Sequence, residues 1–155
     1  MLRGVRMGAV RERLHRYTFS FTFRDPLWRN AIRDFAVSRG VEVLHVHDLP
    51  LVGEAVRVGE ELGIPVIADL HENYPAGLQV WYTSSFKKNT IYALGRWTRY
   101  EKEILEKVDA VIVVIEESRD RLVALGVPAS KIFVVPNTAH KERVNIPLDG
   151  SIVSR

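Results

Sequence analysis

Two histidine-bearing stretches carry the side chains best suited to chemistry in this 155-residue chain. VEVLHVHD ends in His45, His47 and Asp48, and PVIADLHE ends in His71 and Glu72. A neutral imidazole donates a hydrogen bond to a hydroxyl or a phosphate, and a neighbouring carboxylate orients it or acts as a base. The same nitrogen and oxygen atoms bind metal ions. Either chemistry requires that the two stretches meet in space.

Each stretch reads as a buried strand that surfaces at its polar end. Such apolar runs without alternation are typical of parallel strands covered on both faces. The pattern predicts strands at 41–46, 65–70, 110–115 and 132–135 and helices at 26–38, 51–62, 89–107 and 117–125. Alternating strands and helices predict an α/β fold, a Rossmann-like doubly wound parallel sheet in three layers.

The remaining segments are less regular. Residues 5–10 predict a short strand, residues 17–23 a strand or extended segment, and residues 73–88 a long loop rich in aromatic side chains. We expect a single domain over residues 1–140, followed by a tail or the start of a linker at 141–155 with few core-forming residues.

Parallel sheets bind ligands at the carboxyl ends of their strands. Here four successive strand ends carry polar side chains: His45, His47 and Asp48; Asp69, His71 and Glu72; Glu116 and Glu117; Asn137 and Thr138. For Glu117 the simpler interpretation is a helix start, and Asp48 could equally cap the helix after it. For the two histidine-bearing ends we favour a functional role. The glycine-rich dinucleotide fingerprint, the P-loop and the Gly-x-Ser-x-Gly elbow are absent, which disfavours nicotinamide chemistry and ATP hydrolysis.

The composition of the chain limits the kinds of site and partner that it can have. The chain has no cysteine, which excludes disulfides and thiolate metal sites, and no apolar run near the ~20 residues that span a bilayer. Residues 1–40 hold nine arginines and three acidic residues, a net charge of +6, whereas residues 41–155 have a net charge of −3. A solvated basic face is the simpler interpretation, and an anionic partner such as a phospholipid, a nucleotide or a nucleic acid is the alternative. In the segment 81–100, most aromatic residues are expected to pack, with exposure expected for Trp81, Phe86, Lys87 and Lys88.

Four segments in order resemble the N-terminal domain of glycosyltransferase family four, the retaining transferases of GT-B fold. They are VEVLHVHDLPL, PVIADLHENYP, WTRYEKEILEKVDAVIVVIEESRDRL and KIFVVPNT, and together they span about residues 26–138. The resemblance implies hexosyl transfer from a nucleotide-sugar donor to a glycan or lipid-linked acceptor, with no metal and no further cofactor. It implies catalytic roles for His71 and Asp48 and substrate-binding roles for His45, His47, Glu72, Asn73, Glu117 and Asn137.

The chain also departs from that family. The family's first strand with its glycine-rich loop is lacking, as is the second domain that holds most of the donor, so we expect about half an enzyme, inactive alone and in need of a donor domain. We expect cytoplasmic location, with basic residues permitting contact with a membrane surface, a homodimer as an option, and no nucleic-acid partner. A non-catalytic glycan or nucleotide-sugar binding module stays open. So do a nucleotide-sugar epimerase and a metal-dependent hydrolase that uses the histidines with Asp48 and Glu72.

Overall fold

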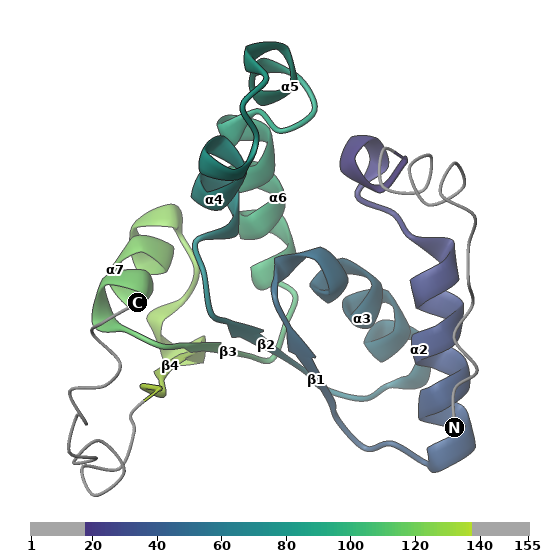
Figure 1. The fold of residues 1–155 in the computed structure, drawn as a ribbon. Coiled ribbons are helices and arrows are strands. Elements are labelled where there is room, and N and C mark those ends of the chain that lie inside the picture. The colour runs from purple at the N-terminus through teal and green to yellow at the C-terminus, as the bar shows by residue number, and fades with distance from the viewer. Residues whose placement is uncertain (1–17, 138–155) are drawn as a thin grey trace, which may run out of the picture.

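The computed structural model describes residues 18–137, which form a four-stranded sheet with helices packed on it (Figure 1). The strands are β1 (Leu44–His47), β2 (Val66–Leu70), β3 (Ala110–Val113) and β4 (Ile132–Val134). The helices are α2 (Pro26–Arg39), α3 (Leu49–Leu62), α4 (Tyr74–Trp81), α5 (Ser85–Asn89), α6 (Leu94–Leu105) and α7 (Glu116–Leu125), with the 3-10 turn η1 (Ala129–Lys131) before β4. Every pairing is parallel, which confirms the predicted Rossmann-like α/β fold. The strand expected at 5–10 and the tail at 141–155 lie outside the described residues.

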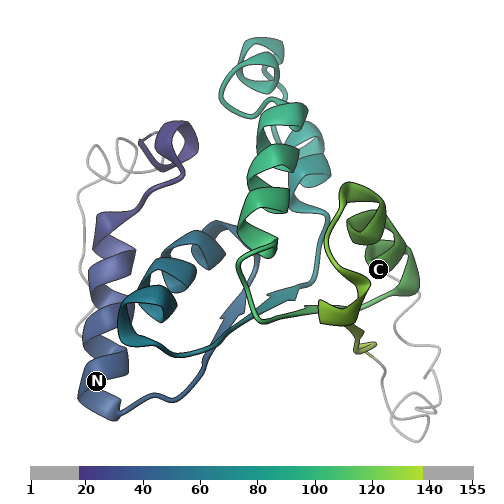
Figure 2. The same cartoon turned by 180° about the vertical axis from the view of Figure 1, so that it is seen from behind.

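The described helices cover one face of this sheet. Strand order follows chain order, β1-β2-β3-β4, and crossovers of one hand then place every connecting helix on the same side. Figures 1 and 2 show this arrangement from opposite directions, with α3, α6 and α7 above the strands in both. Residues 18–137 therefore do not show the third layer that the sequence predicted. Each new strand is added on the same side of the previous one, from β1 to β4, so no connecting helix lies on the opposite face.

The core lies between the strands and these helices. Burial alternates along β3, where Val111 and Val113 are buried and Ile112 is half-buried, and along β1, where Leu44 is buried and His45 exposed. Trp97 of α6 is 1% exposed and packs with Phe19, Phe23 and other aromatic rings above the sheet. The opposite face of the sheet, called the open face below, has no connecting helix over it, and α2 borders it at the β1 edge, where Ile32 and Phe35 line a hollow with His45 and His47.

The helix preceding β1 begins and ends where the sequence predicts. The Asp25 side chain accepts a hydrogen bond from the backbone N–H of Trp28 at 3.0 Å, and Pro26 opens the first turn. Gly40 ends α2 in a left-handed conformation with φ of 60°, which a residue with a Cβ adopts only at a cost. The chain is thereby turned directly into β1.

Residues 18–22 form a helical turn, so the strand or extended segment predicted at 17–23 is wrong for the residues that the structure describes. The alternation of aromatic residues there also fits a helix, since Phe19 and Phe23 are four apart and their rings meet edge to face at 6.4 Å. Arg96 of α6 donates to the carbonyls of Ser20 and Phe21, which satisfies the end of the turn and holds it on α6.

The loop predicted at 73–88 is also wrong, because it contains α4 and α5. Its first residues carry a helix-start signal: Asn73 accepts from the N–H of Ala76 at 3.2 Å, and Pro75 lies in the first turn. The helix predicted from residue 89 begins instead at Leu94, since α5 and the turn after it occupy the first five positions.

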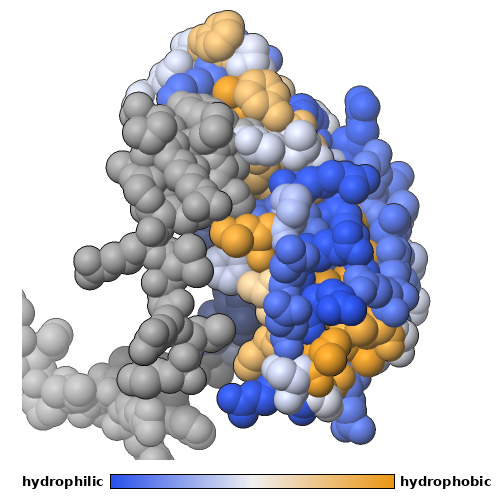
Figure 3. Space-filling view, turned by 90° about the vertical axis from the view of Figure 1, so that its right-hand side faces the viewer, coloured by the Kyte–Doolittle hydropathy of each residue, from blue (hydrophilic) through white to orange (hydrophobic). Residues whose placement is uncertain are grey.

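Part of the basic charge on α2 is neutralised within the fold. Arg29 and Arg33 pair with Glu61 of α3 at 3.0 and 2.5 Å, and the hydrogen bond from Arg33 holds the pKa of Glu61 below its ordinary value. Figure 3 shows that this side of the molecule is largely hydrophilic, with apolar patches between the polar residues. Within residues 18–137, no helix is both long and apolar enough to cross a bilayer.

Candidate functional site

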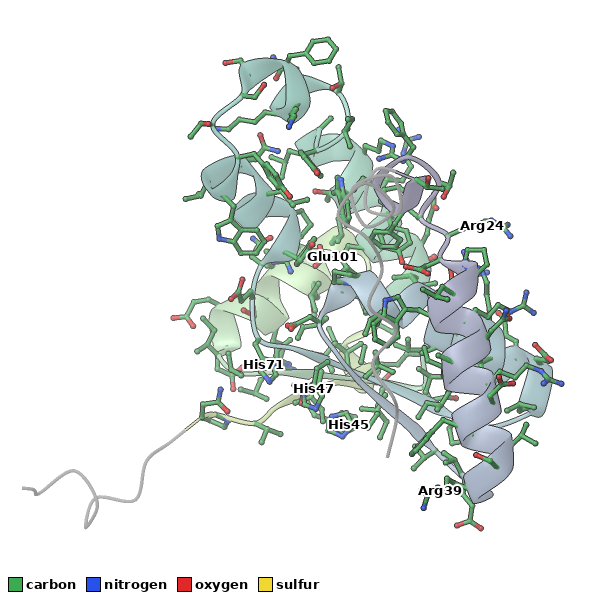
Figure 4. The ribbon with its side chains drawn as sticks, turned by 45° about the vertical axis from the view of Figure 1, so that its right-hand side comes forward. Arg24, Arg39, His45, His47, His71 and Glu101 are labelled. Atoms are coloured by element: carbon green, nitrogen blue, oxygen red, sulfur yellow. The ribbon has the colours of Figure 1, made fainter. Side chains whose placement is uncertain are left out.

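The register of β1 against β2 brings the two histidine-bearing stretches together. His47 pairs with Asp69, and His45 pairs with Ile67 two residues earlier on each strand. Because side chains alternate along a strand, His45, His47 and Asp69 all project from the open face. Figure 4 shows His45, His47 and His71 in a row on this face, away from Glu101 on the helical side. The two histidine-bearing stretches therefore meet in space, as either chemistry considered from the sequence requires.

Asp69 stands at the centre of this group, which we call the histidine cluster: His45, His47, His71 and Asp69. His45 Nε2 lies 3.1 Å from Asp69 Oδ2 in a hydrogen bond, and His47 Nδ1 lies 3.4 Å from the same oxygen. His71 Nε2 faces the other oxygen, Oδ1, at 3.5 Å. The three imidazole rings stack in sequence, with centroids 4.9 and 5.2 Å apart. One carboxylate thus orients three imidazoles.

The cluster is buried at its centre and open at its periphery. The Asp69 side chain is 12% exposed, whereas those of His45 and His47 are 46% and 59% exposed. A buried carboxylate requires compensating donors, and the hydrogen bond with His45 Nε2 supplies one of them. The rings therefore keep a fixed arrangement while their outer edges face solvent.

Asp48 follows β1 in a strained backbone conformation and approaches the cluster from the side. Its φ and ψ are 62° and 147°, a region that favours glycine. Its backbone N–H donates to the Asp69 carbonyl at 2.9 Å, and its Oδ1 lies 3.6 Å from His71 Nδ1. Its side chain makes no capping hydrogen bond to α3, so the alternative role as a helix cap is not observed. Such strain is typical of functional positions.

The surroundings of the cluster are acidic. Asp48, Asp69 and the exposed Glu72 lie at the ends of β1 and β2, and within residues 18–137 none of the three forms an ion pair with lysine or arginine. Tyr74 borders the same region: burial raises the pKa of its phenol, with smaller contributions from Tyr92, Asp48 and Glu72. The site therefore suits hydroxyl groups or cations better than phosphates.

The other candidate residues lie apart from the cluster or have structural roles. The Asn73 side-chain oxygen caps α4. Glu117 lies in the first turn of α7, where its charge favours the helix, and the exposed Asn137 follows β4. With neighbouring strands roughly 4.8 Å apart, the end of β4 is about 14 Å from that of β1, so these residues line the same edge at a distance. Among the described residues, no hydrogen bond or ion pair joins Glu117 or Asn137 to the cluster.

Sequence reasoning missed the central residue. Asp69 was recognised as part of a polar strand end but was not among the candidate site residues. The pairing of Asp69 with His47 reveals that it lies among three histidines. The available signal was a shared spacing: Asp69 and His71 are two residues apart at the end of the second stretch, as His45 and His47 are at the end of the first.

A cavity of about 240 Å³ lies on the helical side of the sheet. Its walls are largely aromatic and include Tyr74, which also borders the cluster, together with Phe19, Trp28, Tyr82, Tyr92 and Trp97. Pro50 and Leu51, at the start of α3, complete the wall beside Asp48. The rings of these aromatic residues offer apolar faces and polar edges to the cavity. The cavity lies at the start of α3, beside the candidate site.

Comparison with known proteins agrees with these features. The family model described as a glycosyl transferase 4-like domain matches residues 1–138, which extends farther toward the N-terminus than the four resembling segments. No curated protein matches the sequence. The match covers most of the chain and includes every residue of the histidine cluster, so this chain belongs to the glycosyl transferase 4-like family.

Proposed function

We propose that this chain forms the acceptor-side wall of the cleft of a retaining hexosyltransferase. The reaction would transfer a sugar from a nucleotide-sugar donor to a glycan or lipid-linked acceptor. The observation that carries this proposal is the histidine cluster beside Asp48 at the carboxyl ends of β1 and β2, where ligands of parallel sheets bind. Membership of the family supports a glycosyltransferase module, and the choice of substrate rests on the chemistry of the site.

His71 and Asp48 are the proposed catalytic residues. Both ring nitrogens of His71 face carboxylate oxygens, Asp48 Oδ1 at 3.6 Å and Asp69 Oδ1 at 3.5 Å. Both distances exceed a normal hydrogen bond, so a sugar hydroxyl can take the place of either contact. His71 donates to a hydroxyl of the donor sugar, and Asp48 orients the ring. As the bond from the anomeric carbon to the nucleoside diphosphate breaks, the acceptor oxygen bonds to that carbon from the same face. The acceptor's proton passes to the departing diphosphate oxygen.

The charge of the site supports the acceptor side of the cleft. Diphosphate groups require cations, and the carboxylates here have no lysine or arginine partner among residues 18–137. Neutral imidazoles and carboxylates instead match the donors and acceptors of sugar hydroxyls. His45, His47 and Glu72 would bind the acceptor near the reaction centre. Asn73, Glu117 and Asn137 would contact parts of the ligands farther along the edge.

The projecting α4–α5 segment supports a lipid-linked acceptor. Figure 1 shows α5 at the end of the molecule farthest from the sheet. Val80, Trp81 and Phe86 are 79%, 51% and 75% exposed there, and Lys87 and Lys88 follow in α5. Exposed aromatic and aliphatic side chains beside lysines are typical of segments that lie in a membrane interface. Vesicles with anionic lipids should therefore bind the chain, and Trp81→Ala with Phe86→Ala should weaken that binding, whereas Phe35→Ala on α2 should not.

The proposal is tested by acceptor binding to the full chain. A panel of glycans and nucleotide sugars is titrated by calorimetry against the wild type and against His71→Ala, Asp48→Asn and Asp34→Asn. Asp34 is an exposed aspartate of α2 and serves as the matched control for Asp48. We expect glycan binding that falls on the order of tenfold in the two site variants and is unchanged in Asp34→Asn, since each lost hydrogen bond to a charged group is worth about 1.5–3 kcal/mol. Equal binding by all four proteins would refute the assignment.

A further inference from the structure

The geometry points to a binding site for a divalent transition-metal ion on the open face, with His45, His47 and Asp69 as its protein ligands. Each of the three offers one ligand atom, and the three atoms lie within 4.8 Å of one another. The set differs from the one weighed from the sequence, because Asp69 takes the place of Asp48 and Glu72. The site goes beyond the proposed function and does not depend on it, since metal binding needs neither a donor nor an acceptor.

Two of the three separations between ligand atoms already fit a tetrahedral site. Zinc bonds of about 2.0–2.1 Å to nitrogen and oxygen place neighbouring ligands roughly 3.3–3.5 Å apart at tetrahedral angles. Asp69 Oδ2 lies 3.1 Å from His45 Nε2 and 3.4 Å from His47 Nδ1. Only the separation between the two imidazole nitrogens still has to close. Small rotations of these half-exposed rings achieve this without movement of the strands.

The backbone supports this arrangement. His45 and His47 are two residues apart on one face of β1, and Asp69 is fixed opposite His47 by the β1–β2 register. A site carried on two paired strands holds its ligands more precisely than one carried on loops. Asp69 is nearly buried, so it is the anchored ligand, and the exposed edges of the histidines leave a fourth position to water.

His71 has a supporting role in this site. It contacts Oδ1 of Asp69, whereas the metal ligand is Oδ2. Hydrogen-bonding groups behind a ligand orient it and tune its affinity. His71→Ala should therefore weaken metal binding less than removal of either ligand histidine.

The ligand set selects the class of ion. Two imidazole nitrogens and one carboxylate suit Zn²⁺, Co²⁺, Ni²⁺ and Cu²⁺, whereas Mg²⁺ and Ca²⁺ require oxygen ligands. Occupation of the site would draw Oδ2 of Asp69 and Nδ1 of His47 away from any sugar. We accordingly expect Zn²⁺ to compete with ligands of the cluster.

The test is titration of the full, untagged chain with Zn²⁺ by calorimetry after chelator treatment and dialysis. We expect one ion per chain and no comparable binding of Mg²⁺. His45→Ala, His47→Ala and Asp69→Asn should each raise the dissociation constant at least about tenfold, the lower end of what even indirect ligand partners cause. The double variant His15→Ala/His140→Ala changes the two histidines outside the described residues and should bind as the wild type does.

A second measurement guards against loss of folding in Asp69→Asn. Co²⁺ bound to the wild type should give the intense visible absorption of a tetrahedral ion, and His45→Ala, which changes a half-exposed side chain, should abolish it. Circular dichroism of each variant verifies the fold. Absence of saturable Zn²⁺ binding, retention of binding in His45→Ala, loss of binding in the His15→Ala/His140→Ala variant, or a larger loss in His71→Ala than in His45→Ala would each overturn the assignment.

Discussion

Gly53 lies at the contact between α3, which begins beside Asp48, and α6, which covers the core. It lies in α3 and faces Tyr100 of α6. A Cβ at position 53 would overlap the Tyr100 hydroxyl and would come within 3.4 Å of Cζ of the same ring. Tyr100 is 6% exposed and cannot swing into solvent. Gly53→Ala therefore forces α3 and α6 apart, and α3 carries Asp48 at its start.

The magnitude follows from two opposed effects. Alanine in a helix interior is favoured over glycine by about 0.8–1.0 kcal/mol. Overpacking a rigid contact typically costs about 1–3 kcal/mol. In Tyr100→Phe the overlapping oxygen is gone and the next ring atom stands at an ordinary contact distance, so only the helix preference remains. Gly53→Ala should thus lower the free energy of unfolding by up to about 2 kcal/mol in the wild type and raise it by about 1 kcal/mol in Tyr100→Phe.

The assay is denaturant unfolding of the four proteins in this double-mutant cycle. The coupling energy between positions 53 and 100 should equal the overpacking cost of about 1–3 kcal/mol, which lies within the range of about 0.5–3 kcal/mol found for residues in contact. Two outcomes would refute the reasoning: stabilisation by Gly53→Ala in the wild-type background, or effects of the two substitutions that simply add.

Three further predictions concern the charges and strain around the fold. Asp48→Gly should raise the free energy of unfolding by on the order of 1 kcal/mol, because glycine accepts the backbone angles that strain Asp48, whereas Asp48→Ala should give no gain; thermal melts compare the two. The fully buried Glu101 accepts two hydrogen bonds from Arg121, at 2.7 and 2.9 Å. Arg121→Ala should destabilise the chain by about 3–5 kcal/mol, because it leaves the Glu101 carboxylate buried without a partner. Glu101→Gln should cost less, and urea titration measures both. Burial raises the pKa of Tyr100 from 10 to about 12, so the phenol loses its proton at lower pH in the unfolded chain than in the folded one. The free energy of unfolding should therefore fall by about 2–3 kcal/mol as the pH rises from below 10 to 12. Tyr100→Phe should remove that part of the fall.

The strand and helix order was predictable because apolar runs and glycine stops are local signals. β1, β2 and the end of α2 at Gly40 lie within a few residues of their predicted positions. The turn at 18–22 was not predictable, because the spacing of Phe19 and Phe23 satisfies two periodicities and contacts with Arg96 and Trp97 decide between them. Tertiary contacts of this kind leave no local pattern.

The location of the candidate site was predictable from the sequence, but the predicted set of site residues was incomplete. The sequence places His45, His47 and His71 at strand ends, which the parallel sheet brings to one edge. It does not reveal which residue on β2 faces them, because a buried aspartate within a strand resembles a structural position. The roles of Asp48 and Asp69 became separable only from geometry: Asp69 orients three rings, and Asp48 contacts one of them from a strained backbone.

The most direct test of the central claim is to follow the imidazole resonances by NMR while an acceptor glycan is titrated into the full chain. The chain has five histidines, and the three of the cluster can be assigned by single substitutions. If the histidine cluster is the acceptor wall, the resonances of His47 and His71 shift with saturation while those of His15 and His140 stay unchanged. Binding of the glycan with no change at His47 or His71 would contradict the claim.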